Sequence, residues 1–416
     1  MGATADRKPA TLRGVIAERQ MLTIFLASLL VLVQVLVSFS LVPLYIAERG
    51  GSSAMIGFQT SLFAIASVML RFIFGPVADL RGRRFALAVG TFAFATGHIA
   101  IWLSPNLWIM AASRVYQAIG MASYLSAASS FVADLAPAEF RGATIGIYRM
   151  VLTAAMMVGP LVGNELIRTY GFGAFFVSMA GLSFIAFVLV LTLRNPPVHH
   201  GAGEEPIRPR DVFTLLGNPA LRAPYLGILI ISIAGGIILT YLTLYAEDVI
   251  ARPALYFTLF AVAGGVGALA LGWLSDRFGR RAVVVPAMLC LALGVAVLWK
   301  LAAFPLSVFY ASAALAGFAY NGGLSLFVSW VIDGATPRLR ATALAMQESG
   351  IDAGFGVGIF IFGLLSEQIP YALLFLWLGL FVALGSAAVR MVSRADHAAA
   401  IPARTKQPPP PERKGE

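Results

Sequence analysis

The chain has 416 residues, of which 59% are hydrophobic and only 12% are charged, and its formal net charge is +10. A soluble domain of this size needs many more polar residues to cover its surface, so the composition excludes a water-soluble globular protein. Nucleic-acid binding is not indicated either, because the basic residues stand in short loops between apolar runs without interleaved aromatic residues.

Apolar runs, each long enough to cross a bilayer as a helix of about 20 residues, recur along the chain. Membrane-spanning strands are not expected, since they are about ten residues long and alternate in polarity. We predict an all-α polytopic membrane protein with twelve transmembrane helices. They cover residues 21–46, 54–74, 85–103, 107–131, 143–167, 174–193, 225–246, 254–274, 282–303, 306–331, 342–365 and 371–391.

The basic residues predict the orientation of the chain in the membrane. With residues 1–20 as a cytoplasmic tail, 23 of the 30 Lys and Arg residues fall on the cytoplasmic side, four on the opposite side and three within spans. Short cytoplasmic loops carry an excess of Lys and Arg, so both termini are expected in the cytosol. The composition and the lack of targeting signals suggest the inner membrane of a bacterium.

A turn rich in glycine and arginine follows the second run. It reads Gly75-Pro-Val-Ala-Asp79-Leu-Arg81-Gly82-Arg83-Arg84. Gly75 is expected to let the helix end tightly, and Gly82 to reverse the chain with a positive φ. The neighbouring arginines are expected to stabilise the charge of Asp79 at the membrane edge.

Two spans of the first half carry unusual residues. Arg114 lies inside the fourth span, where a guanidinium needs a partner or a water-filled cavity. The fifth span contains Gly159, Pro160 and Gly163, which predict a bent helix in close contact with its neighbours. Packing alone explains this group almost as well as a transport role.

One polar stretch, rich in proline and glycine, interrupts the apolar pattern at residues 194–222 and is interpreted as a cytoplasmic linker. It separates a six-helix bundle at 21–193 from a second bundle at 223–392, and residues 393–416 are expected to form a disordered cytoplasmic tail. The neighbouring His199 and His200 lack carboxylate or thiol partners at ligand spacing, so no metal site is predicted.

The second bundle repeats the turn of the first at an offset of 197 residues. The copy is formed by Gly272, Asp276, Gly279, Arg280 and Arg281. A second echo relates Asp134 and Arg141 to Asp333 and Arg340 at an offset of 199. Two matches at nearly the same offset predict two pseudo-symmetric six-helix repeats of parallel orientation.

The eleventh span carries two carboxyl groups, Glu348 and Asp352, four residues apart and therefore on one face of a helix near mid-bilayer. Arg149 in the fifth span occupies the position equivalent to Glu348 in the repeat. One hypothesis is that Glu348 or Asp352 carries a proton while Arg149 attracts a polar or anionic group. The alternative, given equal weight, is a structural role as ion pairs.

These duplicated turns resemble the signature of the major facilitator superfamily, G-x-L-a-D-r-x-G-r-r. The fourth-span run from Arg114 to Gly120 resembles a further motif of that family, and the fifth-span group resembles, with two glycines replaced, a motif of its proton-linked exporters. The resemblance implies a transporter that works by alternating access between two halves. It also implies that the turns at Asp79 and Asp276, with their arginines, latch the halves together on the cytoplasmic side.

Polar and aromatic residues within the spans are candidates for the lining of a substrate cavity, because a hydroxyl, amide or guanidinium in lipid prefers water or a partner. The candidates are Gln34, Arg114, Tyr124, Tyr148, Arg149, Tyr241, Tyr245, Tyr320 and Asn321.

The pattern as a whole favours proton-coupled efflux of a drug or small metabolite, with proton-coupled uptake of a nutrient or organic anion as the alternative. No catalytic motif is found, so an enzyme is a remote alternative, as is a channel. The expected partners are a small-molecule substrate and the lipid bilayer. A monomer is expected, with no cofactor and with the proton gradient as the energy source.

Overall fold

A computed structural model of the protein describes residues 11–137, 139–195, 214–215, 217–336 and 339–404. Within these ranges the chain folds into helices and short turns, without strands. The helices are α1 (Leu12–Ile16), α2 (Arg19–Ser40), α3 (Val42–Glu48), α4 (Ser53–Arg81), α5 (Arg83–Trp102), α6 (Leu107–Leu135), α7 (Arg141–Leu191), α9 (Pro219–Ala246), α10 (Leu255–Phe278), α11 (Arg280–Ala296), the 3₁₀ helix η1 (Val297–Lys300), α12 (Pro305–Gly334), α13 (Arg340–Leu365) and α14 (Tyr371–Arg404).

Eleven segments of the described chain are long and apolar enough to cross a membrane, and one of them contains two crossings. The 51-residue α7 changes direction at Gly171, whose φ of 79° and ψ of 175° lie outside the helical region. A side chain disfavours this backbone conformation, so glycine is suited to the turn. The two parts of α7 correspond to the fifth and sixth predicted spans, which confirms the twelve-helix fold.

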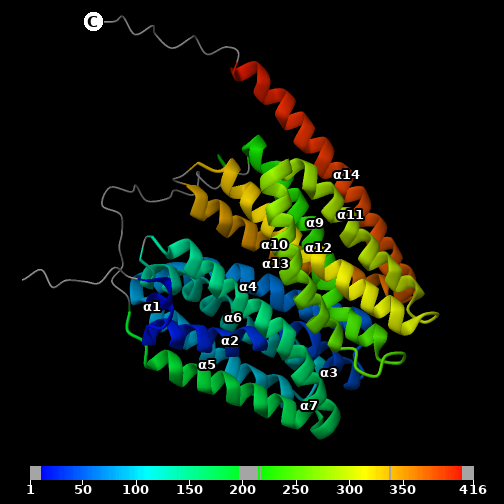
Figure 1. The fold of residues 1–416 in the computed structure, drawn as a ribbon. Coiled ribbons are helices and arrows are strands. Elements are labelled where there is room, and N and C mark those ends of the chain that lie inside the picture. The colour runs from blue at the N-terminus through cyan, green and yellow to red at the C-terminus, as the bar shows by residue number, and fades with distance from the viewer. Residues whose placement is uncertain (1–10, 138, 196–213, 216, 337–338, 405–416) are drawn as a thin grey trace, which may run out of the picture.

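The helices gather into two groups, an N-terminal half with α2 to α7 and a C-terminal half with α9 to α14 (Figure 1). The groups lie close together near α3 and the turn of α7, and spread apart toward α1 (Figure 1). We call the end with the turns at Gly171 and Ala251 the outer end, and the end with α1 and the turns at Gly82 and Gly279 the inner end.

Small residues allow close packing within each half. A Cβ added at Gly294 of α11 would lie 2.6 Å from the backbone nitrogen of Ala316 on α12, and one at Gly90 of α5 would lie 3.0 Å from the Gly120 carbonyl oxygen on α6. Because lipid provides no hydrophobic driving force between helices, such backbone approach supplies much of their attraction. Packing of this kind holds each half together as a bundle.

The α10–α12 contact yields a test of this packing. A Cβ at Gly267 would collide with the backbone of Phe318, whereas a Cβ at Gly265 on the same helix meets nothing within 4 Å. We expect Gly267→Val to lower stability by about 1–3 kcal/mol through overpacking, and Gly265→Val to have a much smaller effect. Thermal unfolding of the two variants in detergent checks this, since the difference in helix propensity cancels. Equal losses would contradict the packing argument.

Several helix ends differ from the sequence prediction, and two of them concern the predicted turn and tail. The α4 helix continues through Gly75 and Pro76 to Arg81, so the expectation that Gly75 ends the helix was wrong. Proline costs the helix one hydrogen bond, but the flanking turns keep it intact. At the other terminus α14 runs to Arg404, so helix extends past the predicted tail boundary at 393, and residues 405–416 lie outside the described range.

Candidate functional site

The two halves meet along a seam formed by α4 against α13 and α7 against α10. Ser61 Oγ of α4 donates to the carbonyl oxygen of Gly356 on α13 at 2.7 Å. Thr258 Oγ1 of α10 donates to the carbonyl oxygen of Met157 on α7 at 2.6 Å. These polar contacts pin the outer part of the seam and close that end of the molecule.

Two ion pairs mark the inner limit of this seam. Arg71 Nη2 lies 2.6 Å from Oδ2 of Asp352, and Arg149 Nη2 lies 3.3 Å from Oε1 of Glu348. Among the polar contacts between the halves made by the described residues, these lie nearest the inner end. The first pair is largely buried, with side chains 19% and 10% exposed, whereas both side chains of the second are about half exposed, at 51% and 50%.

Arg71 is the residue that the sequence prediction missed. It is one of the three Lys and Arg residues within the predicted spans, and an intramembrane arginine is in itself a signal of a functional position. Its pairing with Asp352 could not be derived, because the internal repeat relates Glu348 to Arg149 and assigns Arg71 no acidic partner. The packing of α4 on α13 brings the two together.

Arg114 lies inside the N-terminal half, with no exposed surface. Its Nη1 donates to Gln117 Oε1 at 2.9 Å, its Nη2 donates to the Ser38 carbonyl oxygen at 3.0 Å, and its guanidinium stands 4.4 Å from the ring centre of Phe63. His98 extends the cluster, with Nε2 3.2 Å from Nε2 of Gln117. In this conformation Arg114 braces α2, α4 and α6 and is not accessible to a substrate.

Two of the other cavity candidates of the first half are also enclosed. Gln34 is fully buried, and neither its amide nitrogen nor its amide oxygen has a hydrogen-bond partner among the described residues. Tyr124 is fully buried with its hydroxyl 3.0 Å from Ser28 Oγ. Tyr148 is partly buried, its ring centre 6.2 Å from that of Phe25. Gln34 therefore has unused hydrogen-bonding capacity next to the seam helices.

The candidates of the second half lie at different depths. Tyr241 donates to the carbonyl oxygens of Ser53 and Ile359, at 3.3 and 3.2 Å, and so belongs to the outer contact between the halves. Tyr245 donates to the Leu298 carbonyl oxygen at 2.9 Å within its own half. Tyr320 is buried against Gly235 on α9. Asn321 packs in the same manner against Gly264 on α10.

The duplicated turns adopt one geometry. Gly82 and Gly279 have φ angles of 89° and 86°, because the chain reverses its direction at each of them. The positive φ at Gly82 confirms the prediction. Arg83 Nε lies 3.2 Å from Oδ2 of Asp134, and Arg280 Nε lies 3.2 Å from Oδ2 of Asp333. The sequence repeat is thus also a structural repeat, which includes the contact between the arginine Nε and the aspartate Oδ2.

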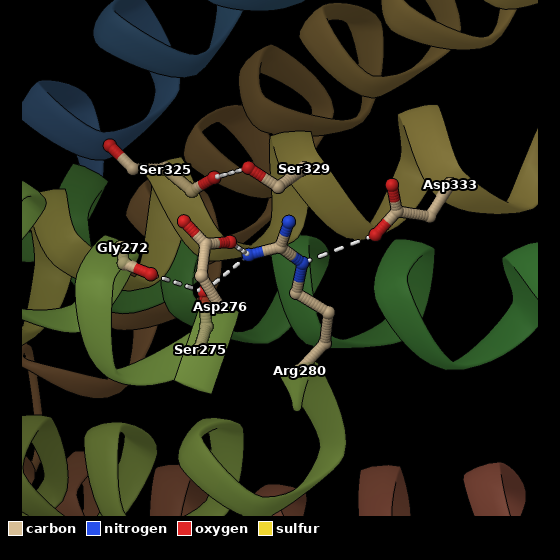
Figure 2. A network of polar contacts seen from close by, with 7 residues as sticks. All are labelled: Gly272, Ser275, Asp276, Arg280, Ser325, Ser329 and Asp333. Carbon is tan, nitrogen blue, oxygen red and sulfur yellow. Dashed lines mark hydrogen bonds and ion pairs between the residues drawn. The ribbon is translucent and has the colours of Figure 1, made fainter. Parts of the chain in front are cut away.

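Arg280 is the centre of the second turn (Figure 2). Its Nη1 lies 2.6 Å from Asp276 Oδ1 and also contacts Ser275 Oγ, while its Nε faces Asp333 on α12. The guanidinium therefore ties the end of α10 to α12. Gly272 takes part through its carbonyl oxygen, which accepts from Ser275 Oγ at 2.8 Å (Figure 2).

These ion pairs lie within each half, not between the halves. Arg84 likewise binds its own half, donating through Nη2 to the Leu191 carbonyl oxygen at 2.6 Å. Arg281 is exposed at the start of α11, and the side chain of Asp79 lies outside the described detail. A latch between the halves through these turns stays a prediction for another conformation.

The glycine and proline group of α7 faces α2. A Cβ at Gly159 would lie 3.3 Å from Val33, and one at Gly163 would lie 2.6 Å from Leu41. Pro160 stands inside the continuous helix. The observed contacts match the close packing expected of these residues.

A carboxylate of the second half joins the start of α4 at the outer end. Glu367 Oε1 accepts from the backbone N–H of Ala54 at 2.7 Å, and the hydroxyls of Ser53 and Tyr371 lie 2.7 Å apart beside it. Bonds from Ala54 and from the Ser52 hydroxyl hold the pKa of Glu367 below its ordinary value. A negative charge at a helix N-terminus is favoured by the helix dipole.

This contact is expected to make closure of the outer end dependent on pH. Since the closed state lowers the pKa of Glu367, the contact contributes fully above the ordinary glutamate pKa and is lost as the pH falls through the lowered value. We expect Glu367→Gln to widen the outer end and to remove this acid dependence. The distance between spin labels at Glu48→Cys and Asp248→Cys, in a Cys290→Ser background, measures the width of the outer end. Its change with pH measures the acid dependence. An unchanged acid response in the variant would contradict the role of Glu367.

Comparison with known proteins identifies similar sequences. The sequence model described as Major Facilitator Superfamily matches residues 24–253 and 250–414. The multidrug resistance protein MdtG of Enterobacter lignolyticus (strain SCF1) is 28% identical over 268 residues, 60% of this chain and 64% of that one. MdtG of Klebsiella pneumoniae (strain 342) is 27% identical over 269 residues, 61% and 65% of the two chains. The matches thus span just under two thirds of these relatives.

Solved structures share the fold at low sequence identity. A mutant of the peptide transporter POT superposes with a TM-score of 0.75 at 14% identity, covering 90% of this chain and 94% of that one. An inward open conformation of the xylose transporter XylE from E. coli superposes with a TM-score of 0.71 at 16% identity, covering 88% and 94%. At these identities the likeness establishes the architecture alone.

Proposed function

Because this chain belongs to the Major Facilitator Superfamily, we propose that it moves a small molecule across a membrane by alternating access, and that it exports a drug or small metabolite in exchange for protons. The names of the relatives, multidrug resistance proteins at 27–28% identity, support the choice of export.

The proposed setting is the inner membrane of a bacterium, with the inner end and both termini in the cytoplasm. The arginine-rich turns at Gly82 and Gly279 support this orientation, because basic loops remain on the cytoplasmic side. In that orientation the structure corresponds to a state closed toward the outside, with the exposed Arg149 and Glu348 reachable from the cytoplasm. We expect a monomer that uses the proton gradient and no cofactor.

The observation that carries the proposal is the pair of ion pairs across the seam. While Asp352 and Glu348 are ionised, their attraction to Arg71 and Arg149 holds the halves together at mid-membrane. A proton on Asp352 removes its attraction to Arg71, and a proton on Glu348 removes its attraction to Arg149. Proton binding would therefore favour separation of the halves along the seam, which couples proton movement to the switch between the two states.

Reconstitution tests the function. A comparison of antibiotic susceptibility and metabolites between deletion and overexpressing cells selects candidate substrates, which are then added to proteoliposomes with a pH-sensitive dye inside. We expect substrate-driven proton movement opposite to the substrate, and acceleration of labelled substrate by unlabelled substrate on the far side. Proton movement in the same direction would indicate uptake. Linear conductance without trans-acceleration would reject the carrier.

A further inference from the structure

An apolar groove lies on the surface of the second half. It has a volume of about 350 Å³ and is lined by residues of α10, α11 and α12. Its floor is formed by buried Leu271, Val283 and Ala287, and its rim by exposed Phe278 and Pro286. At roughly the 30 Å³ that one water molecule occupies, this volume has room for about a dozen groups of that size.

The groove opens at the inner end beside two arginines. The Arg277 guanidinium stands 5.5 Å from the ring centre of Phe278, a rim residue, and the exposed Arg281 directly precedes Ala282, which also lines the groove. Among the described residues, no carboxylate lies within ion-pair distance of Arg277 or Arg281. Arg280 between them is already bound to Asp276 and Asp333 (Figure 2).

An apolar groove that opens beside unpaired cations at the edge of the membrane is complementary to an amphipathic anion. A hydrocarbon chain fits the groove, and an anionic headgroup fits the arginines, because cationic side chains near the cytoplasmic surface attract anionic lipids. We propose that this groove binds one acyl chain of an anionic glycerophospholipid whose phosphate is held by Arg277 and Arg281. The site is separate from the proposed transport pathway and does not depend on it.

The lipid would act on the turn that joins α10 to α11. Arg277 and Arg281 flank Gly279, the positive-φ reversal, and Arg280, which ties α10 to α12. A phosphate that bridges the two arginines would stabilise this turn in its observed conformation. The surface thus offers a means for lipid composition to influence the second half.

Native mass spectrometry of the purified full-length chain tests the proposal, with phosphatidylglycerol, phosphatidylcholine or inorganic phosphate added to lipid-depleted protein. We expect preferential retention of one phosphatidylglycerol. Each arginine near an anionic headgroup is worth about fivefold in affinity, so Arg277→Gln with Arg281→Gln should weaken retention by at least about tenfold. The matched control is Arg81→Gln, a basic residue stacked on Phe85 at the same end of the first half.

A second variant tests the groove itself. Ala282→Phe should block the acyl chain without disturbing the turn, because the repeat already carries Phe85 at the equivalent position. We expect it to reduce phosphatidylglycerol retention while Arg277 and Arg281 remain. Equal retention of phosphatidylcholine would overturn the proposal. An equal loss of phosphatidylglycerol in Arg81→Gln would also overturn it. The same holds if the protein binds inorganic phosphate but no phosphatidylglycerol, or if Ala282→Phe retains phosphatidylglycerol fully.

Discussion

Asp352→Asn is expected to abolish substrate-driven proton movement while exchange of labelled for unlabelled substrate persists. The amide cannot exchange a proton, and it leaves the partly buried Arg71 without its counter-charge 2.6 Å away. Removing one partner of a buried ion pair costs up to about 3–5 kcal/mol, which is enough to shift a two-state equilibrium from one state to the other. The variant should therefore also favour the state in which the seam is open.

Glu348→Gln is the matched control for this substitution. It removes the same charge one helical turn away, but from a pair whose side chains are half exposed, so solvent screens the loss. We expect a small conformational shift and a partial loss of coupling. Proton flux and counterflow in the same proteoliposomes separate the two effects. If both variants retain full coupling, neither carboxyl group carries the proton.

Gly57→Leu is expected to prevent closure of the outer end and so to stop transport. A Cβ at Gly57 would lie 3.0 Å from the carbonyl oxygen of Ile359 and 3.1 Å from the Cα of Gly363, both on α13 of the other half. This backbone of α13 leaves no room for a leucine. Overpacking of about 1–3 kcal/mol applies only to the closed state, and each 1.4 kcal/mol changes the equilibrium about tenfold.

The matched control is Gly181→Leu, where an added Cβ meets nothing within 4 Å. We expect normal transport and an unchanged distance between the spin labels at residues 48 and 248, whereas Gly57→Leu should lengthen that distance. A closed outer end in Gly57→Leu would show that α4 and α13 can separate at this point without opening the molecule.

The two ion pairs illustrate how far the repeat could predict the site. The offset of 199 residues related Arg149 to Glu348 as pseudo-symmetric positions, and the structure joins these two side chains at 3.3 Å. The pairing of Arg71 with Asp352 has no such signal. Arg114 and Tyr124 were expected at a cavity surface, yet both are enclosed in this conformation, and their roles in transport stay predictions.

The sequence alone determined the class of protein, the twelve crossings, the two repeats and the reversals at the duplicated turns. These features depend on local properties, namely the length of apolar runs and the backbone freedom of glycine at Gly82. The tertiary structure decided which charges meet and which glycines are crowded. Contacts such as Arg71 with Asp352 join residues 281 positions apart. They depend on how two bundles pack against each other, and hydropathy contains no information on that packing.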